Sequence, residues 1–234
     1  MEKIGTKDDH DVMQCTDCGL IQVEYPDEKE YNKFYEEGQV YFDHSVIHGH
    51  QSFDARFDHD CRIAEPRVRN LMRHVKGGSL LDVGCGNGAL VKQAADRGFL
   101  CTGVDLNRWL VDNAQRRVPG ARFLCGELPH LDGQLEPPYS TITFIDSFEH
   151  LLDPCKYIEA TKGLLEPDGV VVLEMPDITC DDFKRDGMGW RHMKPKEHAF
   201  LYGPEHIDAL WSLYDMNLLD TVYTIPGRCI YYVG

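Results

Sequence analysis

The stretch LLDVGCGNG, residues 80–88, decides which fold to expect from this chain. Its apolar start ends at Asp82. Glycines then follow at three alternate positions, Gly84, Gly86 and Gly88. Because glycine has no Cβ, such a loop can turn sharply and bring its backbone within hydrogen-bonding distance of a ligand. A helical pattern begins directly afterwards, so the stretch predicts a strand, a nucleotide-binding turn and a helix in that order.

Strand-like and helix-like segments alternate beyond this loop. The expected strands are 79–83, 101–106, 121–125, 141–146, 170–175, 217–224 and 229–233, and the expected helices are 89–97, 108–117, 154–165 and 204–213. Alternation of this kind predicts parallel strands joined by right-handed crossovers, and the close final pair around Pro226-Gly227 predicts a hairpin. We therefore expect an α/β fold, a Rossmann-like doubly wound seven-stranded mostly parallel sheet with an antiparallel C-terminal hairpin.

The part of the chain before the loop gives weaker signals. Residues 1–50 show no sustained periodicity, so we expect an N-terminal extension there and one domain over 51–234. Residues 51–75 have near-helical apolar spacing, and Pro66 is expected to kink or divide that helix. Residues 166–169, Glu-Pro-Asp-Gly, predict a turn before the fifth strand.

Composition narrows the class of protein. The 234 residues carry a formal net charge of −15 at pH 7, and neutralising phosphates requires a basic surface, so we expect no nucleic-acid partner. No apolar run is as long as a membrane span and the N-terminus lacks a signal-peptide core, so we expect a cytoplasmic protein without a membrane partner. Nine scattered cysteines suit a reducing compartment. The oligomeric state is not determined by the sequence.

From about Gln51 to its end, the order of these motifs resembles the class I S-adenosylmethionine-dependent methyltransferases. The glycine loop is similar to the family's first motif, whose backbone faces the methionine and ribose parts of the cofactor beside an acidic residue. The resemblance implies that Asp105 accepts hydrogen bonds from both ribose hydroxyls, and that Glu127 contacts the adenine amino group with Leu128 beside the ring. It also implies S-adenosylmethionine as the cofactor and S-adenosylhomocysteine as the product. The implied cofactor-binding residues are Asp82, Gly84, Cys85, Gly86, Gly88, Asp105, Leu106, Glu127, Leu128 and Asp146.

A nicotinamide-binding fold is the rival interpretation of the same loop. Gly84-x-Gly86-x-x-Ala89 fits the permissive dinucleotide pattern, and Asp105 follows at about the expected distance. However, Asp82 places a negative charge where a pyrophosphate would lie, whereas S-adenosylmethionine carries a positive sulfonium. The C-terminal hairpin also argues for the methyltransferase interpretation.

Two Glu-His pairs are the candidate catalytic groups. Glu149-His150 follows the fourth strand, where an open α/β sheet forms its ligand crevice. Glu197-His198 resembles the Glu-His of sugar C-methyltransferases, in which the histidine acts as a base. Methyl transfer is an in-line displacement, so the protein must align the reactants and remove a proton from a hydroxyl or carbon acid. We therefore predict O- or C-methylation of a small-molecule acceptor such as a sugar or another hydroxylated metabolite, with His198, His150 and Glu149 as catalytic residues. A histidine that only holds the backbone is the alternative for each imidazole.

A second mechanism remains open. Asp146-x-x-Glu149-His150 with the later His198 resembles the Glu-x-x-Glu-His and distant His that hold a divalent metal in small-RNA 2′-O-methyltransferases. Imidazole ligands favour Mn²⁺ or Co²⁺ over Mg²⁺. A catalytically silent protein that binds S-adenosylmethionine is a further alternative. Against these, our prediction is an enzyme without zinc or another divalent metal.

The N-terminal Cys15-x-x-Cys18 motif is half of a zinc ribbon, because a tetrahedral site needs two more ligands. Related methyltransferases carry a second Cys-x-x-Cys upstream, whereas here only His10 stands there. We expect this segment to be free of zinc. The aromatic residues after it resemble the lid that covers the substrate in that subgroup, with surface packing as the alternative. They are Tyr25, Phe34, Tyr35 and Tyr41.

Overall fold

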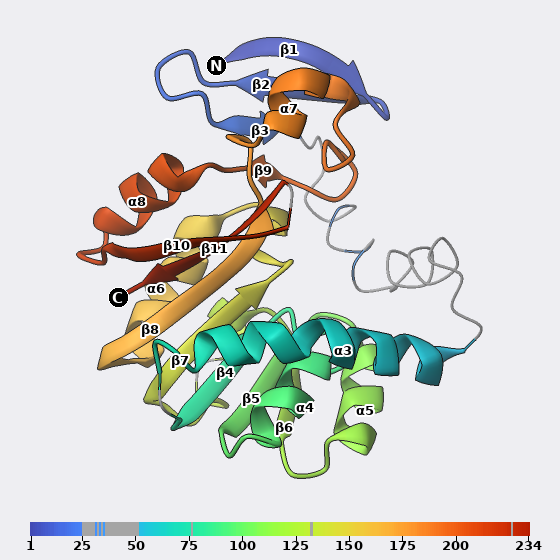
Figure 1. The fold of residues 1–234 in the computed structure, drawn as a ribbon, viewed down its shortest axis with the longest axis vertical. Coiled ribbons are helices and arrows are strands. Elements are labelled where there is room, and N and C mark those ends of the chain that lie inside the picture. Colours follow the sequence, from blue (N-terminus) through green and yellow to red (C-terminus); the bar gives the residue numbers. More distant parts are fainter. Residues whose placement is uncertain are drawn as a thin grey trace. The chain divides into compact units, whose positions relative to one another are not determined.

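A computed structural model describes residues 1–24, 31, 33, 35, 52–75, 77–131, 133–225 and 227–234 of the chain. The aromatic residues Tyr25, Phe34 and Tyr41 lie outside these residues. The chain divides into two compact units. The first comprises residues 1–31, 144–162 and 171–234, and the second comprises residues 32–143 and 163–170. Figure 1 labels the elements of both.

Seven strands form one sheet in the order β10-β11-β8-β7-β4-β5-β6. They are β4 (Ser79–Val83), β5 (Leu100–Asp105), β6 (Arg122–Cys125), β7 (Tyr139–Ile145), β8 (Leu165–Pro176), β10 (Leu218–Ile225) and β11 (Arg228–Val233). Strand β4 pairs parallel with β5 and β7, and β5 pairs parallel with β6. Strand β11 pairs antiparallel with both β8 and β10. The predicted Rossmann-like α/β fold and its reversed C-terminal hairpin are confirmed.

Among the described residues of the second unit, three helices accompany strands β4, β5 and β6. They are α3 (Phe53–Leu71), α4 (Ala89–Ala95) and α5 (Arg108–Arg117), and the short 3-10 turn η1 spans Leu128–His130. Ser52 caps α3 by accepting a hydrogen bond from the Ala55 backbone N–H, and Asn107 caps α5 in the same way through Leu110. Helix α3 buries Ala64, Val68 and Leu71 at helical spacing. The two caps fix where α3 and α5 begin.

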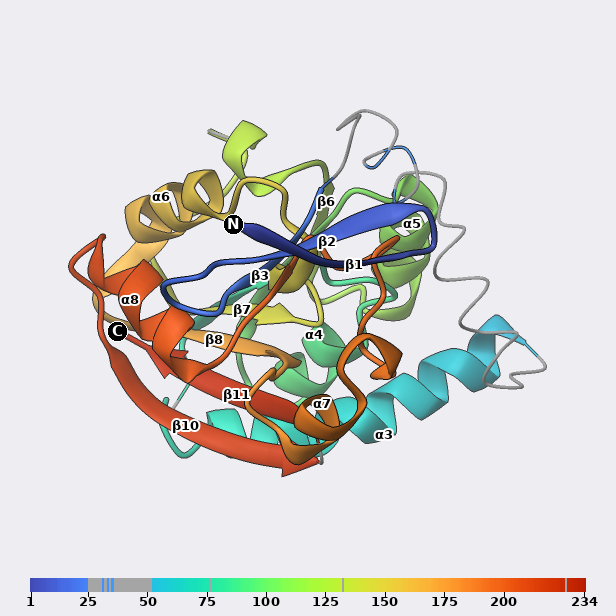
Figure 2. The same cartoon turned by 90° about the horizontal axis from the view of Figure 1, so that it is seen from above.

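The structure tests two local predictions. Pro66 does not divide the helix, since α3 runs continuously through it (Figure 2). A proline inside a helix removes one backbone hydrogen bond and its ring crowds the carbonyl four residues earlier, but packing of the buried face can outweigh that loss. Residues 166–169 fall within the bounds of β8, and a Cβ on Gly169 would lie 3.0 Å from the backbone oxygen of Glu166, so the chain turns back there as predicted.

In the first unit, the N-terminal residues form a second sheet in the order β1-β2-β3-β9, which the sequence patterns did not predict. Its strands are β1 (Glu2–Lys7), β2 (His10–Gln14), β3 (Ile21–Val23) and β9 (Phe200–Leu201), all antiparallel. The other elements are η2 (Phe148–His150), α6 (Pro154–Leu164), α7 (Asp181–Asp186), η3 (Gly187–Gly189) and α8 (Pro204–Ser212). The sheet packs on an apolar cluster of Val12, Ile21, Val23, Ile178, Trp190, Met193 and Leu201. The N-terminal strands thus share a core with residues 178–201.

No helix in the described parts is long and apolar enough to span a membrane.

Candidate active site

The glycine loop is tied to strand β5 through its backbone. The amides of Gly84 and Cys85 both donate to the carbonyl of Val104, at 2.8 and 3.0 Å. Gly86 has φ +52° and Gly88 has φ +82°, conformations that favour glycine. A Cβ on Gly88 would lie 2.9 Å from the Ala114 Cβ, whereas a Cβ on Gly86 would meet nothing within 4 Å. Gly88 is therefore required for packing, and Gly86 borders open space.

Asp105 at the end of β5 holds the same loop. Its Oδ2 accepts a hydrogen bond from the Gly86 amide at 2.8 Å, and its Oδ1 accepts one from the Asn107 amide at 2.9 Å. Burial raises the pKa of this carboxyl group, and the two amide donors oppose the rise. A carboxylate offers about four lone-pair sites, so each oxygen can accept a further hydrogen bond from a ligand. Asp105 thus both organises the loop and keeps acceptor capacity for a diol.

Asp82 lies buried beneath the loop, with 3% of its surface exposed. The hydroxyl of Thr143 donates to its Oδ1 at 2.7 Å. Burial, with a smaller contribution from the nearby Asp105 carboxylate, raises the pKa of Asp82 to about 7 against the opposing effect of the Thr143 hydrogen bond. A cation close to Asp82 would favour the ionised carboxylate. The site is therefore better suited to a positively charged group than to a pyrophosphate.

The remaining predicted cofactor residues of this unit differ in exposure. Cys85 and Leu128 are buried, with 6% and 1% exposed, and burial raises the pKa of the Cys85 thiol. Leu106 and Glu127 are partly exposed, and Glu127 lies 3.4 Å from the His130 ring.

Sequence patterns gave no signal for one further contact of the loop. The Asn87 side chain donates to Asp60 of helix α3 at 2.8 Å. Asp60 is itself held by Arg56 at 2.8 Å. Helix α3 therefore supports the glycine loop from a distant part of the chain.

In the first unit, three predicted catalytic residues meet. One potential ligand atom from each of Glu149, His150 and His198 lies within 4.8 Å of the others, and we call these residues the triad. The rings of His150 and His198 are 5.0 Å apart, and the His150 Nε2 is 3.9 Å from the Glu149 Oε1. His198 is brought there by its loop, because the Ala199 amide donates to the Glu149 carbonyl at 2.9 Å. Asp146, the fourth residue of the metal pattern, does not join this group.

Hydrogen bonds orient both imidazoles of the triad. His150 Nδ1 lies 2.7 Å from the Glu197 carbonyl, and His198 Nδ1 lies 2.8 Å from the His192 carbonyl. Since a carbonyl can only accept, each Nδ1 carries the proton and each Nε2 keeps its lone pair in the neutral ring. Burial lowers the pKa of His150 and, together with the His150 ring, holds that of His198 well below its usual range. Both Nε2 atoms can therefore accept a proton or bind a metal.

Glu149 contributes a buried carboxyl group to the triad. Its side chain is 2% exposed, and among the described residues its Oε2 has no hydrogen-bond partner. Burial and the nearby Asp146 raise its pKa to about 8, against the effect of Arg228. Such a buried carboxyl requires a proton, a cation or a ligand donor. We therefore expect the triad to bind a cation or a ligand.

The Cys15-x-x-Cys18 motif forms the turn between β2 and β3. The Gly19 amide donates to the Cys15 carbonyl at 3.0 Å, and backbone donors from Cys18 and Asp17 lower the pKa of the Cys15 thiol. In the part of the chain that the structure describes, no third His, Cys, Asp or Glu lies close enough to complete a metal site with these two thiols. Among the described residues, the motif therefore offers two metal ligands and no more.

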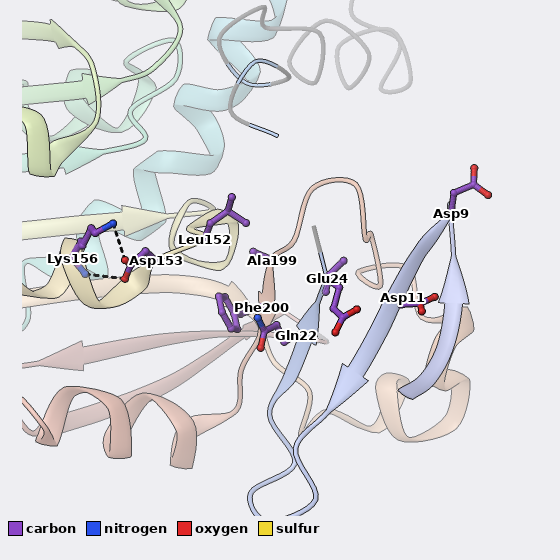
Figure 3. Close-up of a pocket in the computed structure, with 10 residues that line it drawn as sticks. Asp9, Asp11, Gln22, Glu24, Leu152, Asp153, Lys156, Ala199 and Phe200 are labelled. Atoms are coloured by element: carbon purple, nitrogen blue, oxygen red, sulfur yellow. Dashed lines mark hydrogen bonds and ion pairs between the residues drawn. The ribbon is translucent and has the colours of Figure 1, made fainter. Parts of the chain in front are cut away.

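A pocket of about 690 Å³ lies in the first unit (Figure 3). Its lining residues are Asp9, Asp11, Gln22, Val23, Glu24, Leu152, Asp153, Lys156, Ala199 and Phe200. Leu152 and Ala199 each lie within two residues of a triad member along the chain. Four carboxylates and one lysine line the pocket, and Lys156 pairs with Asp153 at 3.0 Å (Figure 3). This lining favours a neutral or cationic ligand over a phosphate.

Comparisons with known proteins identify the family of the chain. A family model described as "Methyltransferase domain" matches residues 55–221. The ubiquinone biosynthesis O-methyltransferase of Coxiella burnetii is 31% identical over 99 residues, which cover 41% of this chain. The chain spans only 42% of the length of that relative.

Solved structures share the fold. A magnesium protoporphyrin IX methyltransferase from Synechocystis with bound S-adenosylhomocysteine superposes with a TM-score of 0.65 at 19% identity, covering 88% of this chain and 99% of that one. The 1,6-didemethyltoxoflavin-N1-methyltransferase of Burkholderia thailandensis also has a TM-score of 0.65, at 17% identity, covering 100% of this chain and 98% of that one. Together with the family match over most of the chain, the glycine loop and the reversed hairpin, these likenesses identify the chain as a member of the methyltransferase-domain family, the class I S-adenosylmethionine-dependent methyltransferases.

Proposed function

We propose that this chain transfers the methyl group of S-adenosylmethionine to an oxygen or carbon atom of a small-molecule acceptor. The observation that carries the proposal is the pairing of open space at Gly86 with the Asp105 carboxylate that holds the same loop. An adenosine ribose has two hydroxyls that can donate hydrogen bonds to a carboxylate, and a glycine with open space beside its Cα lets the backbone approach the ribose. The buried Asp82 suits the positive charge of the cofactor. The residues at the carboxyl ends of strands β4 and β5 thus bind the cofactor in the proposed reaction.

The triad supplies the acceptor side. We assign proton removal to His198, with His150 and Glu149 as its partners, because the unprotonated Nε2 of each imidazole points away from its carbonyl acceptor. A hydroxyl acceptor would lose its proton to the His198 Nε2 as its oxygen bonds to the methyl carbon and the carbon–sulfur bond breaks. The sulfonium then becomes the neutral thioether of S-adenosylhomocysteine. Alignment and proton removal are the main tasks of a protein in such a displacement.

The relatives support a small acceptor. The Coxiella and Burkholderia proteins are named for methyl transfer in ubiquinone biosynthesis and to 1,6-didemethyltoxoflavin. The acidic pocket next to the triad segments and the net charge of −15 disfavour a polyanionic substrate such as RNA. We therefore infer a neutral or cationic metabolite with a hydroxyl group or an acidic carbon, such as a sugar.

The test is production of S-adenosylhomocysteine. Purified chain is incubated with S-adenosylmethionine and a panel of hydroxylated metabolites, and S-adenosylhomocysteine is quantified against methylated product. We expect one molecule of each per turnover with at least one acceptor, and binding of S-adenosylhomocysteine by calorimetry. Binding without turnover across the panel would favour the silent cofactor-binding alternative. Absence of cofactor binding would refute the proposal.

A metal-assisted reaction is the second candidate, and the triad geometry favours it. One carboxylate and two imidazoles with carbonyl-bound Nδ1 groups form a donor set that transition metals prefer. The test is cobalt(II) titration of chelator-treated protein, monitored by visible absorption, with Cys15 and Cys18 changed to serine so that thiols do not compete. Loss of the cobalt signal in His198→Gln but not in the exposed-histidine control His130→Gln would support this candidate. Full methyl transfer after chelation would exclude it in favour of the His198 base.

A further inference from the structure

The hydroxyl group of Tyr31 joins the two segments that carry the triad. Tyr31 is buried, with 6% of its surface exposed. Its hydroxyl oxygen lies 2.7 Å from the His150 carbonyl oxygen and 2.6 Å from the Glu197 carbonyl oxygen. A phenol has one proton, so the hydroxyl shares that proton between the two carbonyl acceptors. A side chain from the N-terminal part of the chain therefore bridges two backbone positions that are 47 residues apart.

The Glu197 carbonyl also receives a proton from an imidazole of the triad. His150 Nδ1 lies 2.7 Å from this oxygen. A carbonyl oxygen has two lone pairs, so it can accept from the phenol and from the imidazole together. The hydrogen bond that one ring nitrogen makes decides which nitrogen of a neutral histidine carries the proton. Because Tyr31 holds the carbonyl that His150 uses, the phenol bears on which nitrogen of His150 keeps its lone pair.

A separate hydrogen bond keeps the two segments paired. The Ala199 amide donates to the Glu149 carbonyl at 2.9 Å. Loss of the Tyr31 hydroxyl alone would therefore leave the segments joined, but the Glu197 carbonyl would lose one of its donors. Glu197 immediately precedes His198, and the rings of the two triad histidines lie 5.0 Å apart. A displaced Glu197 carbonyl would thus disturb both imidazoles without separating the segments.

We propose that Tyr31 is a positioning residue that sets the tautomer of His150 and, through the Glu197 backbone, the placement of His198. The inference rests on the proposed function, in which the triad removes the proton of the acceptor. Tyr31 acts through backbone carbonyls, so its role differs from that of the group that takes the proton. Phenylalanine keeps the ring and its packing, so Tyr31→Phe removes only the hydroxyl.

The first test needs no acceptor. Protein with isotope-labelled histidine nitrogens is studied by nuclear magnetic resonance at mildly alkaline pH, where nitrogen shifts distinguish the two neutral tautomers, and His150→Gln identifies the His150 signals. We expect one tautomer of His150 in the wild-type chain, protonated at Nδ1, and a mixture of both tautomers in Tyr31→Phe. Tyr139→Phe is the matched control. Tyr139 is 2% exposed, and its hydroxyl lies 3.4 Å from the Thr102 hydroxyl and from the Glu136 amide, so this variant loses a buried hydroxyl and should keep the wild-type His150 signals.

The second test separates the rate of methyl transfer from cofactor affinity. With an acceptor that the wild-type chain methylates, Tyr31→Phe should lower kcat between about 10- and 100-fold, because a displacement of about 1 Å in a site can cost that much. The dissociation constant for S-adenosylhomocysteine, measured by calorimetry, should stay unchanged. Tyr31→Phe combined with His198→Asn should be no slower than His198→Asn alone, because Tyr31 acts through that histidine.

The outcomes distinguish the positioning role from folding and from the proposed function. A single Nδ1-protonated tautomer of His150 in Tyr31→Phe, shown to be folded by circular dichroism, would overturn the positioning role. Should Tyr31→Phe fail to fold, 3-fluorotyrosine in place of Tyr31 keeps a hydroxyl of greater acidity, and an unshifted His150 Nδ1 signal would overturn the role instead. Absence of turnover by the wild-type chain would overturn the proposed function, while the tautomer measurement still decides what Tyr31 does.

Discussion

Replacing Gly86 or Gly88 by alanine should have different consequences, although both glycines have positive φ. A left-handed alanine costs about 1 to 2 kcal/mol relative to its ordinary conformations, and this cost applies at both positions. At Gly88 the new methyl group would also lie 2.9 Å from Ala114 and 3.1 Å from Phe123. Overpacking of this kind adds roughly 1 to 3 kcal/mol. At Gly86 the methyl group meets no atom of the described residues within 4 Å, so only the backbone cost remains.

The assay pairs urea unfolding with calorimetric titration of S-adenosylhomocysteine. Gly88→Ala should lose about 2 to 5 kcal/mol of unfolding free energy, whereas Gly86→Ala should lose about 1 to 2 kcal/mol. Gly86→Ala should nevertheless bind the cofactor product at least about tenfold more weakly, a loss of roughly 1.4 kcal/mol, because its methyl group occupies the space that we assign to the ligand.

Gly98→Ala serves as the matched control. Gly98 has φ +91°, and a Cβ there meets nothing within 4 Å. This variant should show the backbone cost with unchanged binding. Wild-type affinity in Gly86→Ala would refute the placement of the cofactor at that position. Equal stability of Gly86→Ala and Gly88→Ala would refute the packing argument.

Three further substitutions test the charged groups. Asp82 has a pKa of about 7 in the folded chain and 3.8 in the unfolded chain, so the folded state holds the proton to higher pH. The unfolding free energy should therefore fall by about 4 kcal/mol as pH rises from about 4 to 7, at 1.36 kcal/mol per pKa unit. Urea unfolding of Asp82→Asn across this range should lack that slope, and parallel curves for the two proteins would contradict the assignment. Asp105→Ala should weaken the binding of S-adenosylhomocysteine, measured by calorimetry. The substitution removes charge-assisted hydrogen bonds worth roughly 1.5 to 3 kcal/mol each and takes away the acceptor of the Gly86 amide. An unchanged dissociation constant would argue against hydrogen bonding of Asp105 to the ribose. His198→Asn should slow production of S-adenosylhomocysteine between about 100- and 10,000-fold while cofactor binding persists, and retained turnover would place the base elsewhere.

Much of the fold could be predicted because its signals are local. The glycine loop, the alternation of strands and helices and the final hairpin depend on steric freedom and on periodicity within short windows. The helix expected at 108–117 matches α5, and the strand expected at 229–233 begins one residue earlier as β11. The N-terminal sheet could not be predicted in the same way, because β3 has three residues and its partner β9 lies far along the chain. Short strands without their partners carry little periodicity.

The sequence by itself determined the class of the protein, since Asp82, the glycine loop and Asp105 follow one another in the order that a sulfonium cofactor site needs. It also named Glu149, His150 and His198 as candidate catalytic residues, but it did not indicate that the three side chains lie close together in space. Only the tertiary structure decided that, and it added Tyr31, whose hydroxyl contacts backbone carbonyls 119 and 166 positions away. The reason is physical: steric and periodic preferences act between neighbours along the chain, whereas hydrogen bonds and ion pairs act through space, between groups that folding brings together.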